Sequence, residues 1–465
     1  MQQNLFNILT ILSMESLESF FKQYPPALIP IYLTGEPNQP IQLYQGSLKI
    51  TQEGTVYEGN GTVSFEWLPS PDVKFLFSKS DNESLIQLEL GKANLNISEI
   101  QSSVEVGISS IIPIGFEHQG GDISGNLNQP VILRSGQNLS HLLFHLTNFH
   151  QFSGIAISTS RGMWLGRLIL EAENWSASID RLENLGDIIK SLKSKGGYAI
   201  THVGTLERSD KKPFSTEEAD DVLEALHWFL SFSRGFRTSP ILLVGYDNSG
   251  EKVWENCTSY TTSPWRSVYS WFADSQDSCS LSKLFPGFLN RWRSTTWNQP
   301  IRFAIHWYLE SIAQAGSVQG SIVLMQAAFE IIAWTLLVEE KAIISQQGFE
   351  KLAAVDQLRL LLSQCSVPLK VPDTLTDLLK ASKELNWVDG AQALTEIRNA
   401  IVHPNPKKRQ KYLNRPFPEQ IDAYKLGLWY LELILLNLFK YKGKYFNRIA
   451  NKEFYQENIE VVPWF

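Results

Sequence analysis

The sequence GTVSFEWL at residues 61–68, followed shortly by VKFLF at residues 73–77, decides the fold of the N-terminal part of the chain. Apolar and polar side chains alternate in these stretches, and the apolar positions hold β-branched or aromatic residues, as in half-buried β-strands. Similar runs follow at residues 84–90 and 102–108, separated by turn-forming sequences. We therefore predict a β-rich N-terminal domain, residues 1–135, folded as a sandwich or a barrel.

The region that follows, residues 136–300, mixes helix and strand signals. The sequence LSHLLFHLTNF at residues 139–149 predicts a helix, and the amphipathic sequence at residues 180–197 predicts another that ends at a glycine pair. Residues 215–218, Ser-Thr-Glu-Glu, have the pattern of a capping box at the start of a third helix. Strand-like runs lie between these helices, which predicts an α+β region that is either a second domain or a continuation of the first.

From residue 301 to residue 465 the pattern is that of helices alone. Apolar residues recur at spacings of three and four, most strongly at residues 317–340 and in a long final helix at residues 419–441. The connecting segments are short or marked by proline. We predict a C-terminal all-α bundle of about six helices, so that the whole chain is a multidomain α+β protein.

Composition and charge limit the classes of function. The chain has 465 residues, 43% of them hydrophobic and 19% charged, as in globular proteins, and its net charge of −7 argues against a general nucleic-acid coat protein. Residues 301–465 contain 19 Lys and Arg against 17 Asp and Glu, a net of +2, so the preceding part carries a net of −9. The acidic part suits a protein or small-molecule partner better than RNA.

We expect a cytoplasmic location and no membrane partner. Three scattered cysteines, Cys257, Cys279 and Cys365, are too few for a disulfide framework or a cysteine-based zinc site. The N-terminal sequence lacks the basic start of a signal peptide. The sequence has no run of about 18 uninterrupted apolar residues, so we predict no transmembrane helix.

The stretch Arg398-Asn-Ala-Ile-Val-His403-Pro404 contains the side chains that a metal-free ribonuclease uses. A guanidinium can hold a phosphate at two points, and an imidazole can move a proton near neutral pH. Near the end of a helix, Arg398 and His403 can project to the same side. The alternative is an ordinary helix end, with a surface arginine, a histidine near the negative end of the helix dipole and a terminating proline.

The C-terminal region resembles the HEPN superfamily of helical-bundle ribonucleases and toxins. Arg398, Asn399 and His403 fit the family's Arg-x4–6-His pattern just before the last helix. The helix pair with His306-Trp307 and with Ala328-Phe329-Glu330 contributes to the resemblance, and so does the segment Gly443–Arg448 after the final helix. A β-rich region before such a domain is also similar to the ApeA-like anti-phage defence proteins.

The resemblance implies a metal-independent endoribonuclease that needs no cofactor and cleaves RNA. Arg398 would bind the scissile phosphate, His403 would move the proton of the 2′-hydroxyl or of the leaving 5′-oxygen, and Asn399 would position one of them. The products would be a 2′,3′-cyclic phosphate and a 5′-hydroxyl. Because one Arg–His pair offers a single titrating group, we expect a homodimer through the C-terminal bundle, as in many family members.

Other residues would support this site. Glu330 lies in the apolar sequence AAFEIIAW and is expected either to pair with Arg398 or to point to solvent. The basic residues Lys407, Lys408 and Arg409 directly follow the motif and are candidates for substrate binding, although solvated loops have the same composition.

Different functions remain open at this point. A non-catalytic HEPN module, acting as a dimerisation or RNA-binding scaffold, is the alternative to the nuclease, and a carbohydrate-binding N-terminal region is a third idea. The N-terminal region would sense a trigger or recruit a partner in a defence effector. Among His141, His145 and His150, the first two are four residues apart, as on a zinc-binding helix. No cysteine or acidic third ligand follows at a fitting distance, so we expect no metal site there.

Overall fold

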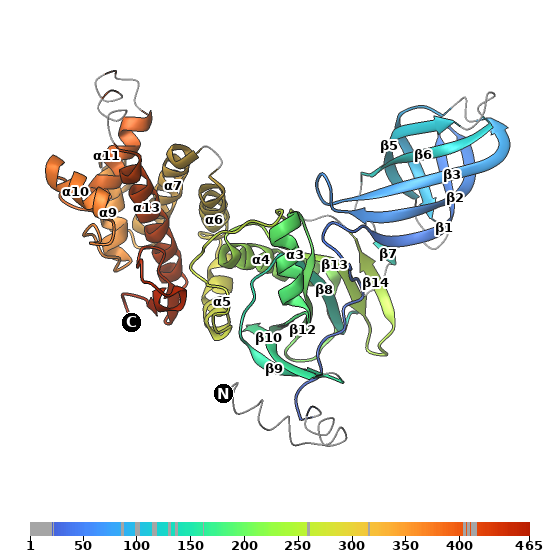
Figure 1. Ribbon diagram of the computed structural model, residues 1–465, viewed down its shortest axis with the longest axis horizontal. Coiled ribbons are helices and arrows are strands. Elements are labelled where there is room, and N and C mark those ends of the chain that lie inside the picture. Colours follow the sequence, from blue (N-terminus) through green and yellow to red (C-terminus); the bar gives the residue numbers. More distant parts are fainter. Residues whose placement is uncertain are drawn as a thin grey trace. The chain divides into compact units, whose positions relative to one another are not determined.

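In the computed structural model the described residues form two compact units (Figure 1). The first unit comprises residues 1–169, 174–223 and 238–266, and the second comprises residues 170–173, 224–237 and 267–465. The structure describes residues 21, 23–84, 88–97, 103–113, 119–128, 132–134, 138–160, 162–257, 261–314, 317–402, 406, 410 and 416–465.

The N-terminal strands of the first unit form a closed antiparallel barrel in the order β1-β2-β3-β6-β5-β4. The alternation of the sequence explains it, because Val63, Phe65, Phe75 and Phe77 all point into the buried core. Of the two architectures that the sequence predicted, the barrel is the one that forms. The strands are β1 (Ile41–Gln52), β2 (Thr55–Glu66), β3 (Asp72–Ser84), β4 (Gly91–Ile97), β5 (Ser103–Pro113) and β6 (Gln119–Leu127).

One glycine shows how closely the barrel strands approach one another. A Cβ atom at Gly125 in β6 would collide with the carbonyl oxygen of Gly107 in β5, so only glycine fits this position without a backbone shift.

An eight-stranded sheet completes the first unit, in the order β7-β14-β13-β8-β12-β11-β10-β9. The core of the barrel is continuous with residues of this sheet, and Trp67 of the barrel stacks on Tyr198 with ring centroids 5.8 Å apart. The strands are β7 (Ile132–Arg134), β8 (His141–Thr147), β9 (Ile155–Thr159), β10 (Gly162–Ala172), β11 (Trp175–Arg181), β12 (Ile200–Arg208), β13 (Pro240–Tyr246) and β14 (Lys252–Asn256).

The helix predicted at residues 139–149 is wrong, because this segment forms strand β8. It lies in the middle of the sheet, hydrogen-bonded to β12 and β13, and nearly all of its side chains are buried. A strand covered on both faces has a continuous apolar run rather than an alternating one, and such a run cannot be distinguished from a buried helix by its periodicity.

Helix α3 (Leu185–Lys195) ends at the predicted glycine pair and α4 (Thr216–Arg234) begins at the predicted capping box, but α3 begins at Leu185 rather than at residue 180, because Asp180 and Arg181 still belong to β11. Helix α3 is followed by Gly196 with a φ of 70°, a conformation that favours glycine. The backbone N–H of Ser215 donates to Glu218 Oε2 at 2.8 Å, and the N–H of Glu218 donates to Ser215 Oγ at 3.3 Å.

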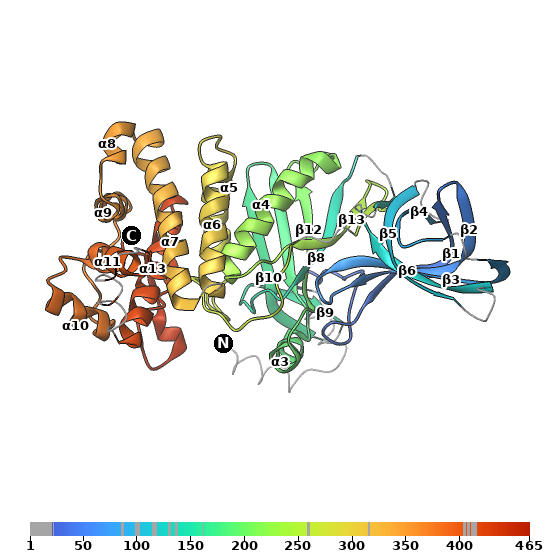
Figure 2. The ribbon, with the colours of Figure 1, turned by 90° about the horizontal axis from the view of Figure 1, so that it is seen from above.

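The second unit is mainly helical, and α7 and α13 form its centre. Helix α7 packs on α6, α9, α11 and α13, and Figure 2 shows α6 and α7 side by side. The helices are α5 (Cys279–Trp292), α6 (Asn298–Ala313), α7 (Ser317–Trp334), α8 (Gln346–Glu350), α9 (Ala354–Gln364), α10 (Thr376–Leu385), α11 (Gly390–Val402) and α13 (Phe417–Leu438). The predicted bundle, residues 301–465, lies within this unit, and its first residue is in the first turn of α6.

The helix predicted at residues 317–340 forms as α7 and its continuation, a π-helix at Thr335–Glu340. The prediction of helices alone after residue 301 is wrong at the end of the chain, where a small hairpin follows the last helix. This hairpin joins β15 (Lys444–Phe446) to β16 (Ile459–Val461), with a 3₁₀ turn at Tyr455–Asn458. Three-residue strands are too short to leave a periodic signal in a sequence.

The segment Ser317–Glu340 is long and apolar enough to cross a membrane, with a mean hydropathy of 1.9. In the structure, 61% of its most apolar part is buried, and it packs against four other helices of the unit. The core helix of a bundle meets the same criteria of length and composition, so this segment is weak evidence for a membrane span.

The capping box of α4 makes a testable prediction. Replacing Ser215 with Ala removes the acceptor for the N–H of Glu218, and we expect a loss of about 1 kcal/mol in the free energy of unfolding. Ser215→Asp keeps an acceptor oxygen and should retain most of the stability. Equal stability of Ser215→Ala and the unchanged protein in urea unfolding would contradict the capping role.

Candidate functional site

The predicted catalytic residues Arg398 and Asn399 lie near the C-terminal end of α11, a helix that packs on α7, α9 and α13. The side chain of Arg398 is 25% exposed. Its Nη1 donates a hydrogen bond to Asn399 Oδ1 at 3.2 Å. The asparagine therefore holds one edge of the guanidinium.

Glu330 of α7 faces Arg398 across the helix contact and is also open to solvent. Its Oε1 lies 4.0 Å from Arg398 Nη2, at the outer limit of an ion pair, and its side chain is 46% exposed. The same oxygen accepts a hydrogen bond from Gln326 Nε2 at 3.0 Å. Glu330 thus both contacts Arg398 and is open to solvent, the two positions expected from the sequence, and its pairing with Arg398 is loose.

Three buried polar atoms between α7 and α11 have no hydrogen-bond partner within the described residues. They are Gln326 Oε1, Thr395 Oγ1 and Arg398 Nε. Thr395 and Arg398 are three residues apart on one helix and so share a face, and Gln326 is joined to Arg398 through Glu330. An unsatisfied buried polar atom costs about 1–3 kcal/mol, so this polar face between α7 and α11 is incomplete as far as the described residues show.

The other predicted site residues lie outside the described part of the chain. These are His403, which directly follows the last residue of α11, and the basic residues Lys407, Lys408 and Arg409. The structure gives no positions for their side chains.

The three histidines of the mixed region are structural. His145 is buried in β8, and its Nε2 accepts hydrogen bonds from the backbone N–H groups of Ile31 and Tyr32 at 3.2 and 3.1 Å. Its Nδ1 is 3.1 Å from the carbonyl oxygen of Leu242 and must carry the proton. Burial lowers the pKa of His145 to about 4, so the ring is neutral.

The neighbouring histidines are also engaged with the fold. His141 stacks on Tyr246, and His150 is buried beside Phe149. Within the described residues, no group of three or more His, Cys, Asp or Glu side chains is placed to hold a metal ion.

A buried ion pair, which sequence reasoning did not single out, joins the final helix to the segment after β15. Arg448 donates to both carboxylate oxygens of Glu432, with Nε 2.8 Å from Oε2, and Tyr308 Oη donates to Oε1 at 2.6 Å. Glu432 is fully buried and the side chain of Arg448 is 10% exposed. The one signal in the sequence was a glutamate within the apolar run LWYLELILLNL of α13.

The charges of this pair control the ionisation of its members. Burial alone would lower the pKa of the Arg448 guanidinium, but the adjacent Glu432 carboxylate overcomes this effect and raises it. Burial, and then the same carboxylate, raise the pKa of Tyr308 well above its usual value. The Arg448 guanidinium thus stays charged and the tyrosine stays neutral at any ordinary pH.

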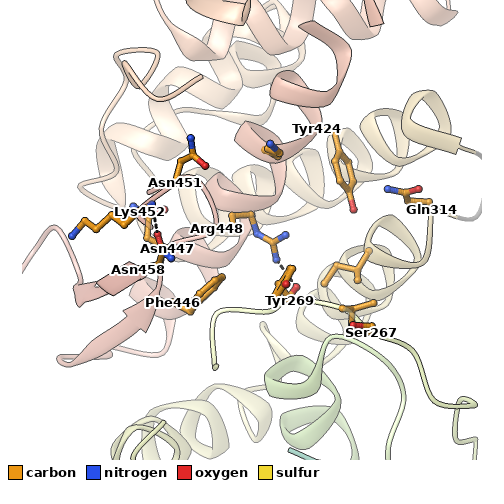
Figure 3. A pocket seen from close by; sticks show the side chains of 13 residues that line it. Ser267, Tyr269, Gln314, Tyr424, Phe446, Asn447, Arg448, Asn451, Lys452 and Asn458 are labelled. Atoms are coloured by element: carbon orange, nitrogen blue, oxygen red, sulfur yellow. Dashed lines mark hydrogen bonds between the residues drawn. The ribbon is translucent and has the colours of Figure 1, made fainter. Parts of the chain in front are cut away.

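Arg448 also lines a cavity of about 430 Å³ in the second unit. Figure 3 shows Arg448 beside Tyr269. The carbonyl oxygen of Tyr269 accepts a hydrogen bond from Arg448 Nη2 at 3.0 Å. The cavity is formed by Ser267, Val268, Tyr269, Ile312, Gln314, Tyr424, Lys425, Phe446, Asn447, Arg448, Asn451, Lys452 and Asn458. These residues come from distant parts of the sequence, so no local motif could have predicted it.

A closed β-barrel, an antiparallel sheet with helices and a helical C-terminal unit define a multidomain α+β protein. A family model described as the YopA C-terminal domain matches residues 294–460, and one described as the YopA central domain matches residues 134–268. The SPbeta prophage-derived protein YopA of Bacillus subtilis (strain 168) is 31% identical over 446 residues, or 94% of this chain and 98% of the relative. The chain belongs to the YopA family. No solved structure matches it.

The buried ion pair makes a prediction about stability. Glu432→Gln leaves the charge of Arg448 buried without a counter-ion, and we expect a loss of about 3–5 kcal/mol. Tyr308→Phe removes one hydrogen bond and should cost about 1 kcal/mol. The measurement is thermal unfolding followed by circular dichroism, with the exposed Glu457→Gln as the matched control. If Glu432→Gln and Glu457→Gln unfold at the same temperature, the pair does not stabilise the helical unit.

Proposed function

We propose that the C-terminal bundle is a HEPN-like domain and that the protein is a metal-independent endoribonuclease, with Arg398, Asn399 and His403 as its catalytic residues. The observation that supports this proposal best is the incomplete polar face between α7 and α11. There a guanidinium is partly exposed and loosely paired with Glu330, and its Nε has no hydrogen-bond partner among the described residues. A phosphate oxygen is the kind of acceptor that such a group binds most strongly.

The reaction needs only the RNA and the protein. The 2′-hydroxyl attacks the adjacent phosphorus and gives its proton to a base, while the bond to the 5′-oxygen breaks and that oxygen takes a proton from an acid. A 2′,3′-cyclic phosphate and a 5′-hydroxyl result, and the charge is balanced without a metal ion. DNA lacks the attacking hydroxyl and is not a substrate.

Each residue has a separate task in this scheme. Arg398 stabilises the negative charge that develops on the phosphoryl oxygens, and His403 transfers a proton. Asn399 holds the guanidinium, as its 3.2 Å hydrogen bond indicates. Glu330 keeps the guanidinium in place between substrates, because its 4.0 Å contact is weak enough to be exchanged for a phosphate.

The remaining parts of the proposal concern partners. Lys407, Lys408 and Arg409 directly follow the motif and supply charge for the RNA backbone. A second copy of the bundle supplies the second titrating group, so the active form is a homodimer. The acidic N-terminal part receives the trigger, and the prophage origin of the Bacillus relative supports a role in conflict with phages in the cytoplasm.

The nuclease proposal predicts the effect of single substitutions. His403→Ala and Arg398→Ala should each lower RNA cleavage in EDTA by about 100-fold to 10,000-fold, because each removes a group that acts in the transition state. The products should carry 2′,3′-cyclic phosphate and 5′-hydroxyl ends. Cleavage is measured on labelled RNA by gel electrophoresis and end-group analysis.

A matched control separates catalysis from charge. Lys383→Ala removes one positive charge from an exposed position on α10 and should cleave RNA normally. Undiminished cleavage by His403→Ala would reject the assignment of the site. RNA binding by the unchanged protein without any cleavage, with its oligomeric state intact, would favour the non-catalytic scaffold instead.

A further inference from the structure

The cavity beside Arg448 carries positive charge that its own lining does not offset. Lys425 and Lys452 line it with exposed side chains, and neither ammonium group forms an ion pair or a hydrogen bond within the described residues. The thirteen residues that line the cavity include no Asp or Glu. Since the buried Glu432 carboxylate neutralises Arg448, the two lysines remain as net positive charge at the cavity.

Arg448 contributes hydrogen-bond donors to the same cavity. Its Nε and Nη2 are engaged by Glu432 and by the carbonyl oxygen of Tyr269. The hydrogen bonds of Arg448 to Glu432 and to Tyr269 do not use its Nη1. The ion pair therefore fixes the position of the guanidinium and leaves one nitrogen available to an anion, an arrangement suited to binding a phosphate oxygen.

One wall of the cavity is aromatic. Tyr269 is 59% exposed, which is high for a large ring, and it stacks on Phe446 with centroids 5.7 Å apart and an interplanar angle of 21°. The backbone N–H of Phe446 donates to the carbonyl oxygen of Trp271 at 2.6 Å, which fixes the base of this stack. Figure 3 shows both rings on the side of the cavity that holds Arg448.

Amide side chains complete the lining. The exposed Asn451 and Gln314 both line the cavity, and Gln314 forms a hydrogen bond with the Tyr424 side chain. Amides can donate and accept, so they suit the edge of a heterocyclic base. The volume of about 430 Å³ lies within the range of about 300–1,000 Å³ that is typical of small-molecule sites.

We propose that this cavity binds a nucleoside phosphate. The base stacks on Tyr269, and the phosphate is bound by Lys425, Lys452 and Nη1 of Arg448. Stacking contributes about 1–3 kcal/mol per base and is tolerant of base identity, so several nucleotides should bind. The proposal uses none of the residues of the nuclease site and stands or falls separately from it.

The test is a calorimetric titration of the full-length protein with the four ribonucleoside 5′-monophosphates. The unmodified nucleosides and inorganic phosphate serve as probes for the two halves of the ligand, and both should bind at least about tenfold more weakly than a monophosphate. Lys425→Ala and Lys452→Ala should each raise the Kd about tenfold, because each removes a charged contact. Lys442→Ala, an exposed lysine outside the lining, is the charge control and should not change it.

The aromatic contact has its own matched pair of variants. Tyr269→Leu should weaken binding about tenfold, whereas Tyr269→Phe keeps the ring and should bind as before. The ring is exposed, so neither change should unfold the protein, and the unfolding temperature checks this. Failure of every monophosphate to bind, or binding that is unaffected by Lys425→Ala and Lys452→Ala, would overturn the proposal. So would equal affinity for inorganic phosphate.

Competition distinguishes the two sources of such a ligand. A short 5′-phosphorylated RNA that displaces the bound monophosphate, where the 5′-hydroxyl form does not, would assign the site to the ends of RNA chains. No displacement would assign it to free nucleotides. RNA cleavage by Lys425→Ala, measured in parallel, should equal that of the unchanged protein, so a failure at this cavity is distinct from a failure at Arg398.

Discussion

The buried contact of Glu432 with Arg448 and Tyr308 is the constraint on which the geometry of the helical unit depends. It joins α13, α6 and the segment after β15 at one point, through a fully buried carboxylate and a guanidinium that is 10% exposed. Such a pair tolerates little displacement, because moving one member leaves the other charged and unsolvated. The hairpin after the last helix and the wall of the nearby cavity are therefore held in register with the bundle core.

Two polar surfaces of this unit have opposite characters. Around Arg448 the fold supplies the counter-charge of the guanidinium through Glu432 and engages its Nε and Nη2 atoms. Around Arg398 three buried polar atoms have no partner among the described residues, and the guanidinium has only a weak contact with Glu330. Incomplete polar sites of the second kind lower stability, and proteins retain them mainly where a ligand or a partner completes the contacts. This contrast is the physical basis for placing the proposed chemistry at Arg398.

Local patterns in the sequence predicted much of the fold. The alternation through residues 61–77 predicted the barrel strands, and the Ser-Thr-Glu-Glu sequence predicted the start of α4 down to its two reciprocal hydrogen bonds. Strand β8 was mistaken for a helix because a strand buried on both faces shows no period of two. The β15–β16 hairpin was missed because its strands are too short for any periodic pattern.

The sites were less accessible to sequence reasoning than the fold. The sequence predicted the contact between Arg398 and Glu330 as one of two alternatives, because a glutamate buried in an apolar helix needs a partner. The cavity was not, because Tyr269, Tyr424 and Lys452 meet only through tertiary packing. The most direct measurement follows the Nε–H resonance of Arg398 by NMR while an uncleavable 2′-O-methyl RNA strand is added. A phosphate bound at this guanidinium predicts a large shift and slower hydrogen exchange of that resonance. Binding of RNA that leaves the Arg398 resonance unchanged, or the absence of binding, would contradict the account.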